Sequence, residues 1–597
     1  MSLPAPSIDP DALFGVARSV TGKRWILAPG DAARAARIAA ATGVEDIAAR
    51  VLAARGVAPE DAAAFLTPKL KAAMPDPSVL KDMDIAAARI ARAIASGEGI
   101  AIFGDYDVDG VTASALLHRW LSALGVTPAV YLPDRMTDGY GPNVAAFEEL
   151  AAGGAGLIVT VDCGASAFEP IAAAKALGAE TVVLDHHQMG EGRPDAAALV
   201  NPNQPGCAAG LGDLSAAGVA FMAAVATTRV LRADGFFKER AEPNLLDLLD
   251  LAALGLVCDV MPMRGLARVL VAQGLKVMGA RKAPGMSALL GRACGDKTPT
   301  AHDLGFGLGP RINAAGRIAH PRLAFDLLTA PDAASAERAA DRLDVLNAER
   351  KAIEAAATEE AIEQITARGA DRPVVFAMAE GWHPGVVGIV AGRLRERFGR
   401  PAIAVSVMDG VGRGSGRSVP GVDLGRAVRA AAESGLLVAG GGHAQAAGLT
   451  LEPDKASAFA AFIEREIKRQ TPDGAPVETL LVDVEARPGA VSASVAKALS
   501  PIGPFGPENK EPTLALQSVR IDRADIRGGR HLALTISGRT GEPVARAIAF
   551  RAVGEPLGDL LLQAGGRPVH LVGVVRPDDW RGGGAGEFHI LDAAPAI

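Results

Sequence analysis

TVVLDHH, at residues 181–187, is the stretch that decides the fold of this chain. It joins a short run of β-branched and aliphatic residues to one carboxylate and two imidazoles. Such a run is typical of a strand buried on both faces, as in the parallel sheets of α/β proteins. Ligands of these folds bind beyond the carboxyl ends of the strands. We therefore expect Asp185, His186 and His187 at the functional edge of a parallel sheet.

Three more apolar segments end in acidic residues. GIAIFG at 99–104 runs into DYDVDG, GLIVTV at 156–161 runs into Asp162, and LLDLLDLAALGLVC at 245–258 runs into Asp259. In a parallel sheet the ends of such segments meet at one edge. The side chains expected to converge there are Asp105, Asp107, Asp109, Asp162, Asp185, His186, His187 and Asp259.

This acidic set indicates a metal site. Clustered carboxylates repel one another unless cations neutralise them. Oxygen ligands with some imidazole suit manganese or magnesium, and the absence of paired cysteines disfavours structural zinc. A calcium-binding EF-hand is excluded for DYDVDG, because the twelfth position of the loop, which must be Glu, is Leu116. Taken one at a time, acidic residues at strand ends are more often caps or turn formers than ligands.

Length and composition bound the remaining architecture. At 597 residues the chain exceeds one hydrophobic core, so we expect three or four domains. Its four cysteines form no CxxC pair, which fits a reducing cytoplasm better than a disulfide framework. No signal peptide or membrane span is expected, and the protein should be a soluble, cytoplasmic monomer. The net charge of −7 argues mildly against indiscriminate binding of nucleic acid.

The chain divides by pattern into five parts. Residues 1–95 are expected to form a helical N-terminal lead-in that carries no functional residues. Residues 96–331 are expected to form the α/β lobe that carries the acidic set. Residues 332–367 read as one long charged helix that connects this lobe to a second α/β lobe at 368–472. From 473 to 597 alternating segments such as HLALTISG indicate a small antiparallel barrel of the oligonucleotide-binding type.

Two glycine-rich stretches suggest contacts with phosphate. GPRINAAGR carries Arg311, Asn313 and Arg317, and GSGRS carries Ser415 and Arg417. Glycine lets backbone amides approach an anion, and arginine binds phosphate bidentately. Residues 393–429 hold eight arginines against three acidic residues, a local balance of +5. Ligand-free surface turns remain the alternative for both stretches, and GGGH at 440–443 is read either as an anion-holding turn or as tight helix packing.

The motifs together resemble the RecJ family, the single-strand-specific 5′ exonucleases of the DHH phosphoesterase superfamily. The resemblance covers nearly the whole chain and rests on motifs in one order: DYDVDG, VTVDCG, LDHH, LGLVCDVMP, GPRINAAGR, WHPGVVGIVAGRL, GSGRS, GGGH and PFGPENKEP. It implies a DHH lobe, a connecting helix, a DHH-associated lobe and an oligonucleotide-binding barrel. It also implies a nuclease of recombination and repair that releases 5′ mononucleotides from single-stranded DNA.

The resemblance assigns roles residue by residue. It implies two Mn²⁺ or Mg²⁺ ions bound by Asp107, Asp109, Asp162, His186, His187 and Asp259. Asp105 stands where the family also has Asp, and Asp185 is expected to hold an imidazole tautomer. The residues expected to seat the 5′ phosphate are Arg135, Arg311, Asn313, Arg317, Ser415, Arg417 and His443. Single-strand-binding protein and a RecQ-type helicase are the partners that the resemblance implies.

Two departures and two rival functions stay open. The chain has Ala267 where the family has Asn, and Ala216-Ala217-Gly218 where it has Gly-Val-Gly. These departures bear on the substrate channel. One rival is a phosphodiesterase for short oligonucleotides or cyclic dinucleotides, which the long connector and the barrel disfavour. The other is a non-catalytic DNA-binding scaffold, which the complete ligand set disfavours.

Overall fold

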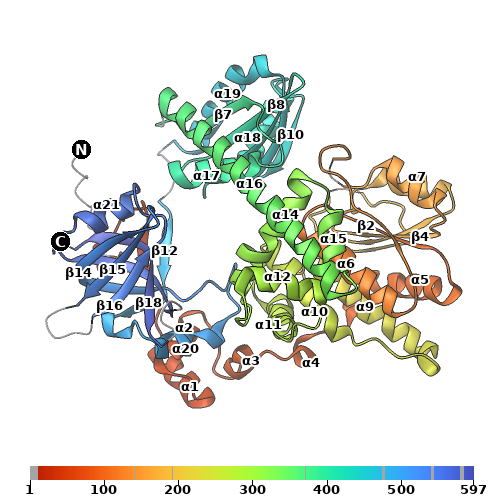
Figure 1. The fold of residues 1–597 in the computed structure, drawn as a ribbon, viewed down its shortest axis with the longest axis horizontal. Helices are drawn as coiled ribbons and strands as arrows, with labels where there is room; N and C mark the ends of the chain where they lie inside the picture. The colour runs from red at the N-terminus through yellow and green to blue at the C-terminus, as the bar shows by residue number, and fades with distance from the viewer. Residues whose placement is uncertain are drawn as a thin grey trace. The chain divides into compact units, whose positions relative to one another are not determined.

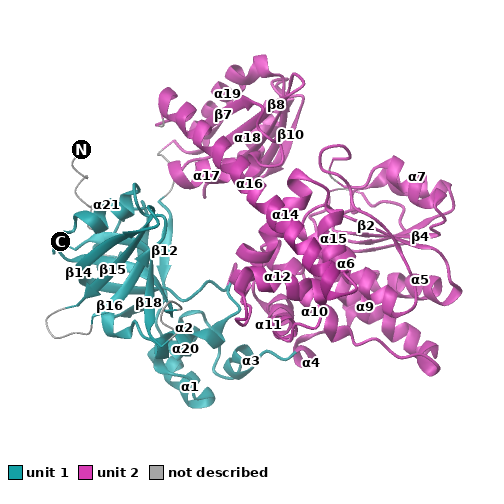
Figure 2. Cartoon of the chain, in the orientation of Figure 1, with its two compact units in different colours: residues 1–69, 476–505, 509–597 teal, residues 70–475, 506–508 magenta. Residues whose placement is uncertain are grey.

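The computed structural model describes residues 11–139, 141–190, 192–369, 371–472, 477–538, 544–578 and 584–596. They form two compact units, coloured separately in Figure 2. Unit 1 contains residues 1–69, 476–505 and 509–597, and unit 2 contains residues 70–475 and 506–508. The expected lead-in of residues 1–95 is therefore divided between the two units.

A five-stranded parallel sheet forms the first lobe of unit 2. Its order is β3 (Ala129–Tyr131), β2 (Ile100–Gly104), β4 (Leu157–Val161), β5 (Glu180–Leu184) and β6 (Ala198–Val200). β2, β4 and the last four residues of β5 are buried on both faces. Ile102 and Phe103 of β2, for instance, enter hydrophobic clusters on opposite sides of the sheet. The structure confirms the expected buried parallel sheet.

Helices cover both faces of this sheet (Figure 1). One cluster includes side chains of α7 (Val144–Ala152) and α8 (Phe168–Ala176). The larger cluster on the other face includes α5 (Met83–Ser96), α6 (Val108–Ala123), α9 (Ala216–Ala233), α10 (Leu249–Cys258), α11 (Gly265–Gly279), α12 (Pro284–Cys294) and α15 (Arg322–Leu328). Helix α9 is long and apolar enough to cross a membrane, but 72% of it is buried inside the protein, as in the core helix of a soluble protein.

Two segments of this lobe differ from the expected structure. The apolar segment before Asp259 is helix α10, not a strand, and Asp259 caps its carboxyl end. The glycine-rich stretch around Arg311 is also helical: a π-helix at Leu304–Leu308 continues into α14 (Gly309–Ile318). Both segments pack against the helical layer rather than joining the sheet.

The long connector is confirmed as α16 (Ala333–Arg368), which leads to the second lobe. That lobe has a sheet in the order β10 (Ala439–His443), β11 (Ala446–Leu451), β9 (Val411–Arg417), β8 (Ala402–Met408) and β7 (Val375–Glu380), with helices α17 (Val387–Phe398), α18 (Leu424–Glu433) and α19 (Ala456–Gln470). Among these described strands only β7 and β8 pair in parallel.

Unit 1 contains the expected barrel. Strands β14 (Leu514–Arg527), β15 (His531–Ser537), β16 (Ala545–Ala549), β18 (Gly586–Pro595) and β17 (Val569–Pro577) follow one another, and pairing of β14 with β17 closes the ring. The strand β1 (Arg24–Leu27) pairs in parallel with β12 (Thr479–Val482). Helices α1 (Ala32–Thr42) and α2 (Asp46–Ala54) share the hydrophobic core of the barrel. Residues 11–69 therefore complete the barrel unit rather than forming a separate helical region.

Candidate metal centre

The register of the sheet aligns three acidic residues at one edge. Gly104 of β2 pairs with Val161 of β4, which pairs with Leu184 of β5. The next residues along these three strands are Asp105, Asp162 and Asp185. Parallel strands in this register bring the three carboxylates to the carboxyl edge together, as the sequence predicts.

Asp162 has a strained backbone. Its φ is 63°, in the left-handed region that residues other than glycine rarely occupy. Such conformations persist only where the surrounding structure enforces them, and they gather at functional sites. The turn also places Gly164, whose added Cβ would lie 2.5 Å from Thr160 Oγ1, which explains the small residue after Cys163.

The amino ends of two helices hold the remaining acidic residues of DYDVDG. Asp107 caps α6, because its Oδ1 accepts hydrogen bonds from the amides of Asp109 and Gly110 at 2.9 and 3.1 Å. Asp109 is buried and accepts hydrogen bonds from Ala216 N at 2.6 Å and Ala217 N at 3.1 Å, at the start of α9. Both bonds come from backbone amides, so the alanines that depart from the family pattern still hold Asp109.

Helix α10 supplies Asp259 and closes the site from the helical side. A Cβ on Gly255 of α10 would lie 2.4 Å from Asp109 Oδ1 and 2.6 Å from Ala217 Cβ. Glycine at this position is therefore required for the close approach of α10 to the acidic residues. One turn later Asp259 reaches the same cluster as the strand ends.

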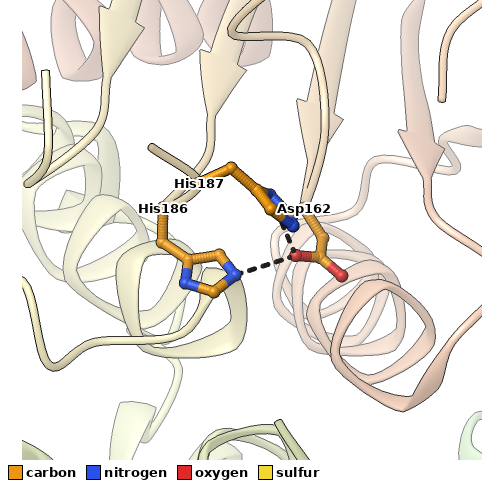
Figure 3. A group of neighbouring side chains, drawn as sticks. All are labelled: Asp162, His186 and His187. Carbon is orange, nitrogen blue, oxygen red and sulfur yellow. Dashed lines mark ion pairs between the residues drawn. The ribbon is translucent and has the colours of Figure 1, made fainter. Parts of the chain in front are cut away.

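The acidic residues and the two histidines form three overlapping groups. His186 Nε2 lies 3.2 Å from Asp162 Oδ1 and 3.5 Å from Asp259 Oδ2 (Figure 3 shows the pair with Asp162). His187 Nδ1 lies 3.9 Å from Asp162 Oδ1. The groups, each within 4.8 Å, are Asp162–His186–His187, Asp109–His186–Asp259 and Asp105–Asp107–Asp162. They are linked through Asp162 and His186, which suits two cations with shared ligands.

Asp185 supports the histidines rather than joining these groups. Its Oδ1 accepts hydrogen bonds from the amides of His186 and His187 at 2.7 and 3.1 Å and lies 2.8 Å from His187 Nδ1. Its Oδ2 accepts a hydrogen bond from Ala165 N at 3.0 Å. Burial would raise the pKa of Asp185, but the hydrogen bond with His187 keeps that pKa below its usual value. An ionised Asp185 therefore fixes the ring of His187.

Two asparagines of the NPNQPG turn also support the histidines. Asn201 Nδ2 donates to the His187 carbonyl at 2.9 Å, and Asn203 Nδ2 donates to the His186 carbonyl at 2.6 Å. Asn201 is fully buried. Sequence reasoning missed both residues, although their position directly after β6, the neighbour of β5, is the signal that could have identified them.

Burial, together with repulsion between the carboxylates, raises the pKa values of the acidic residues. Burial and the charge of Asp107 raise the pKa of Asp105 to about 8, and burial and the charge of Asp109 raise the pKa of Asp259 to about 8. The pKa of Asp162 is also raised well above its usual value, chiefly by burial. Without cations this cluster therefore holds protons near neutral pH.

The residues present fit two divalent cations. Three buried atoms that face the cluster make no hydrogen bond within the described part of the chain: Asp105 Oδ1, Asp162 Oδ1 and His186 Nε2. Buried polar atoms rarely lack a partner, so unpaired lone pairs in one place indicate ligands for an ion. Burial also lowers the pKa of His186 to about 4, which leaves its imidazole neutral, as a metal ligand must be. A set rich in oxygen with two imidazoles suits Mn²⁺ or Mg²⁺.

A group of arginines lies beside the metal centre. Arg317 of α14 is partly buried, and its Nη1 donates to the Gly385 carbonyl of the second lobe at 2.9 Å. Burial and the charges of Arg135, Arg350 and Arg417 lower the pKa of Arg317 to about 10. The charges of these three arginines all act on Arg317, and we group the four residues for that reason. We call this group the arginine cluster.

Two contacts with Tyr106 place the arginine cluster next to the acidic residues. Arg135 lies over the ring of Tyr106, 3.9 Å from its centroid, and Tyr106 lies between Asp105 and Asp107. A Cβ on Gly316 of α14 would lie 2.4 Å from the Tyr106 carbonyl oxygen. Arg417 Nη1 donates to Ser415 Oγ at 3.0 Å. Like charges held this close favour a bound anion.

Arg350 was missed from the sequence. It is buried on α16 and donates from Nη1 to Glu354 at 2.5 Å and from Nη2 to Asn347 at 3.0 Å. In the sequence it is one charged residue among many on a long charged helix. Only the packing of α16 against α14 and α17 distinguishes it.

Other predicted phosphate residues lie differently from expectation. The guanidinium of Arg311 is bound by Asp344 at 2.6 Å and by the carbonyls of Gly307 and Arg292, so the structure does not bring it to the arginine cluster. Asn313 lies one turn before Arg317 on α14. His443 is exposed on β10, two strands from Arg417 at the same level of the sheet.

The glycine-rich motifs of the second lobe are strands, not loops. GSGRS lies in and just after β9, which pairs with β8 and β11 on its two sides, so its amides are not open to an anion as expected. GGGH lies in β10, which pairs with β11. Contacts with phosphate in this lobe therefore fall to side chains such as Ser415 and Arg417.

Comparisons with known proteins agree with this architecture. "DHH family, N-terminal domain" matches residues 99–256, "DHHA1 domain" matches 371–469 and "RecJ OB domain" matches 482–592. The chain is 40% identical over 474 residues to the single-stranded-DNA-specific exonuclease RecJ of Dickeya dadantii, covering 77% of this chain and 82% of that protein.

Two solved structures are similar over most of the chain. The crystal structure of RecJ with Mn²⁺ from Thermus thermophilus has a TM-score of 0.79 and 30% identity, over 95% of this chain and 78% of that one. The structure of the same protein with Mg²⁺ has a TM-score of 0.73 and 29% identity, over 96% and 78%. With its metal centre, connector and barrel, the chain belongs to the RecJ family of DHH exonucleases.

Proposed function

We propose that this protein is a metal-dependent exonuclease that degrades single-stranded DNA from the 5′ end and releases 5′ mononucleotides in recombination and repair. The observation that carries the proposal is the contact between Arg135 of the arginine cluster and Tyr106 within the acidic motif. A terminal phosphate bound by these arginines would lie beside a phosphodiester at the metal centre. The relatives named as single-stranded-DNA-specific exonucleases support this substrate.

The metal ions, when bound, lower the pKa of a water molecule and stabilise negative charge on the phosphoryl and leaving oxygens. The residues that would hold them are Asp105, Asp107, Asp109, Asp162, His186, His187 and Asp259. Their carboxyl groups must first release the protons that burial and mutual repulsion retain. Asp185 accepts a hydrogen bond from Nδ1 of His187 and so fixes the orientation of this ring beside the other ligands.

The arginine cluster would fix the position of the strand. A terminal phosphate carries more negative charge than an internal one and presents more acceptor oxygens to guanidinium groups. Arg317 is held by the Gly385 carbonyl and Arg417 by Ser415, so both are oriented before DNA arrives. Their position sets which phosphodiester reaches the acidic residues, which restricts cleavage to the end of the strand.

We also propose the domain division made from the sequence, with a DHH lobe at 96–331, a connector at 332–367, a DHH-associated lobe at 368–472 and a barrel at 473–597. The family matches at 99–256, 371–469 and 482–592 fall within these bounds, which supports the division. A cytoplasmic monomer that works with single-strand-binding protein and a RecQ-type helicase completes the proposal.

The test is a product profile from a long single strand labelled at either end. With Mn²⁺ we expect labelled mononucleotides to appear first from the 5′ label, and no hydrolysis with chelator. Arg417→Ala should raise KM for DNA with a 5′ phosphate more than for DNA with a 5′ hydroxyl. Arg322→Ala, which removes an exposed arginine paired with Asp326, is the matched control and should change neither. Release of long internal fragments, or of mononucleotides first from the 3′ label, would contradict the proposal.

A further inference from the structure

The π-helix Leu304–Leu308 presents one aromatic side chain to solvent. Leu304 and Leu308 are buried, whereas Phe306 between them is 75% exposed. The ring of Phe306 stacks on that of His302, with centroids 4.7 Å apart and planes inclined by 29°. π-Helices are rare and occur frequently at functional sites. Phe306 and His302, which we call the aromatic pair, thus offer an open flat face.

The π-helix that carries Phe306 of the aromatic pair packs against a residue adjoining the metal centre. The π-helix packs against the end of α10, where Cys258 Sγ donates to the Leu304 carbonyl at 3.6 Å. A Cβ on Gly309 would lie 2.6 Å from Cys258 Sγ. Asp259 of the metal centre follows Cys258, and Val260 after it is 67% exposed. An exposed apolar side chain therefore follows directly after a residue of the metal centre.

Helix α14 relates the aromatic pair to the arginine cluster. At its carboxyl end Arg317 belongs to the arginine cluster, and its amino end continues from the π-helix. Arg317 lies eleven residues after Phe306, a helical rise of about 16 Å at ~1.5 Å per residue. A stacked strand advances about 3.4 Å per nucleotide and an extended one roughly twice as far. The aromatic pair therefore lies about two to five nucleotides from a phosphate bound at the arginine cluster.

Resting on the proposed function, we propose that the aromatic pair is a stacking platform for one base of the single strand, two to five nucleotides from its 5′ end. Every base has a π-face, so stacking on Phe306 holds the strand without reading its sequence. In a duplex both faces of a base are covered by its neighbours and the base is paired. The platform thus favours unpaired DNA downstream of the bond that is cleaved.

The experiment compares binding of two kinds of 5′-phosphorylated single strand, in chelator to prevent hydrolysis. One is intact, and the other carries a single abasic residue placed in turn at nucleotides 2 to 7. At one or two positions the abasic residue should weaken binding by the wild type about ten-fold, the loss typical of one stacked base. Phe306→Ala should bind intact DNA about ten-fold more weakly and should show no further loss with the abasic strand.

Two variants separate stacking from folding. Phe306→Trp should restore both tight binding and sensitivity to the abasic residue, whereas Phe306→Leu, which is apolar but cannot stack, should not. Leu177→Ala removes a 57% exposed apolar side chain at the far end of α8 and should bind like the wild type. Equal binding by Phe306→Ala and the wild type, or a further abasic loss in Phe306→Ala, would overturn the platform. Wild type that does not degrade single strands would instead overturn the proposed function.

Discussion

Replacing Asp185 by asparagine tests whether this residue orients His187 for the metal centre. Both oxygens of the carboxylate accept hydrogen bonds. Oδ1 accepts them from the backbone amides of His186 and His187 and also contacts Nδ1 of His187. Oδ2 accepts one from the backbone amide of Ala165. Asparagine has nearly the same shape but only one acceptor oxygen. If that oxygen faces the histidines, its NH₂ group points at the Ala165 amide, 3.0 Å from the atom it replaces.

The size of the effect follows from these bonds. A buried donor left without an acceptor costs about 1–3 kcal/mol, so Asp185→Asn should lower the free energy of unfolding by that amount. Loss of a residue that orients a metal ligand typically weakens metal binding about 10- to 100-fold. The hydrogen bond with Asp185 raises the pKa of His187 to about 9, so the substitution should also lower that pKa.

Two measurements check this prediction. Calorimetric titration with Mn²⁺ gives the metal affinity, and NMR titration of the imidazole signals of the metal-free protein gives the pKa of His187. Asp195→Asn is the matched control, because Asp195 is an exposed residue of the same lobe whose carboxylate pairs with Lys175 at the surface. Unchanged Mn²⁺ affinity together with an unchanged pKa of His187 would refute the reasoning.

Two further predictions concern the acidic residues and their packing. Because burial holds the pKa of Asp105 near 8, above the 3.8 of the unfolded chain, and Asp185 holds the pKa of His187 near 9, above 6.5, the metal-free native state binds more protons than the unfolded state. Stability in chelator should therefore fall from pH 7 to pH 9 and Mn²⁺ should restore it; thermal unfolding that is flat with pH would contradict this. Gly255→Ala should cost about 1–3 kcal/mol of stability and weaken Mn²⁺ binding, because its Cβ would meet Asp109. Gly291→Ala, where a Cβ would meet no described atom within 4 Å, is the control, and equal Mn²⁺ affinity of the two variants would count against the close approach.

The strand-borne half of the site could be predicted from the sequence. Short β-branched runs that end in Asp are distinctive, and their common register at one edge follows from the parallel sheet. Asp105, Asp162, His186 and His187 were predicted in this way. Asp259 was expected at the same edge for the wrong structural reason, because its segment is helix α10.

The errors have physical causes. Residues Leu249–Leu256 of α10 are buried all round, so the sequence shows no 3.6-residue pattern, and only the length of the run favours a helix over a strand. Gly412, Gly414 and Gly416 resemble a flexible loop, but an added Cβ at each would meet side chains of the core, such as Val405, within 3.1 Å. Glycine is needed at these positions because core side chains pack closely against the strand, and the sequence alone does not show this packing.

Other parts of the site depend on contacts between distant segments. In the sequence Asn201 and Asn203 look like residues of an ordinary turn. They reach the carbonyls of His187 and His186 only because β6 lies beside β5. Arg350 joins the arginine cluster through the packing of α16. The role of residues 11–69 in the barrel unit depends likewise on the pairing of β1 with β12, more than 400 residues later.

The most direct test of the central claim is hydrolysis of a 5′-phosphorylated single strand by Asp162→Asn in saturating Mn²⁺. Asp162 belongs to two of the three ligand groups, and asparagine tolerates its left-handed backbone while removing the charge. We predict that mononucleotide release in a single turnover is abolished, whereas DNA binding in chelator stays at the wild-type level. Release at the wild-type rate would contradict the assignment of the metal centre.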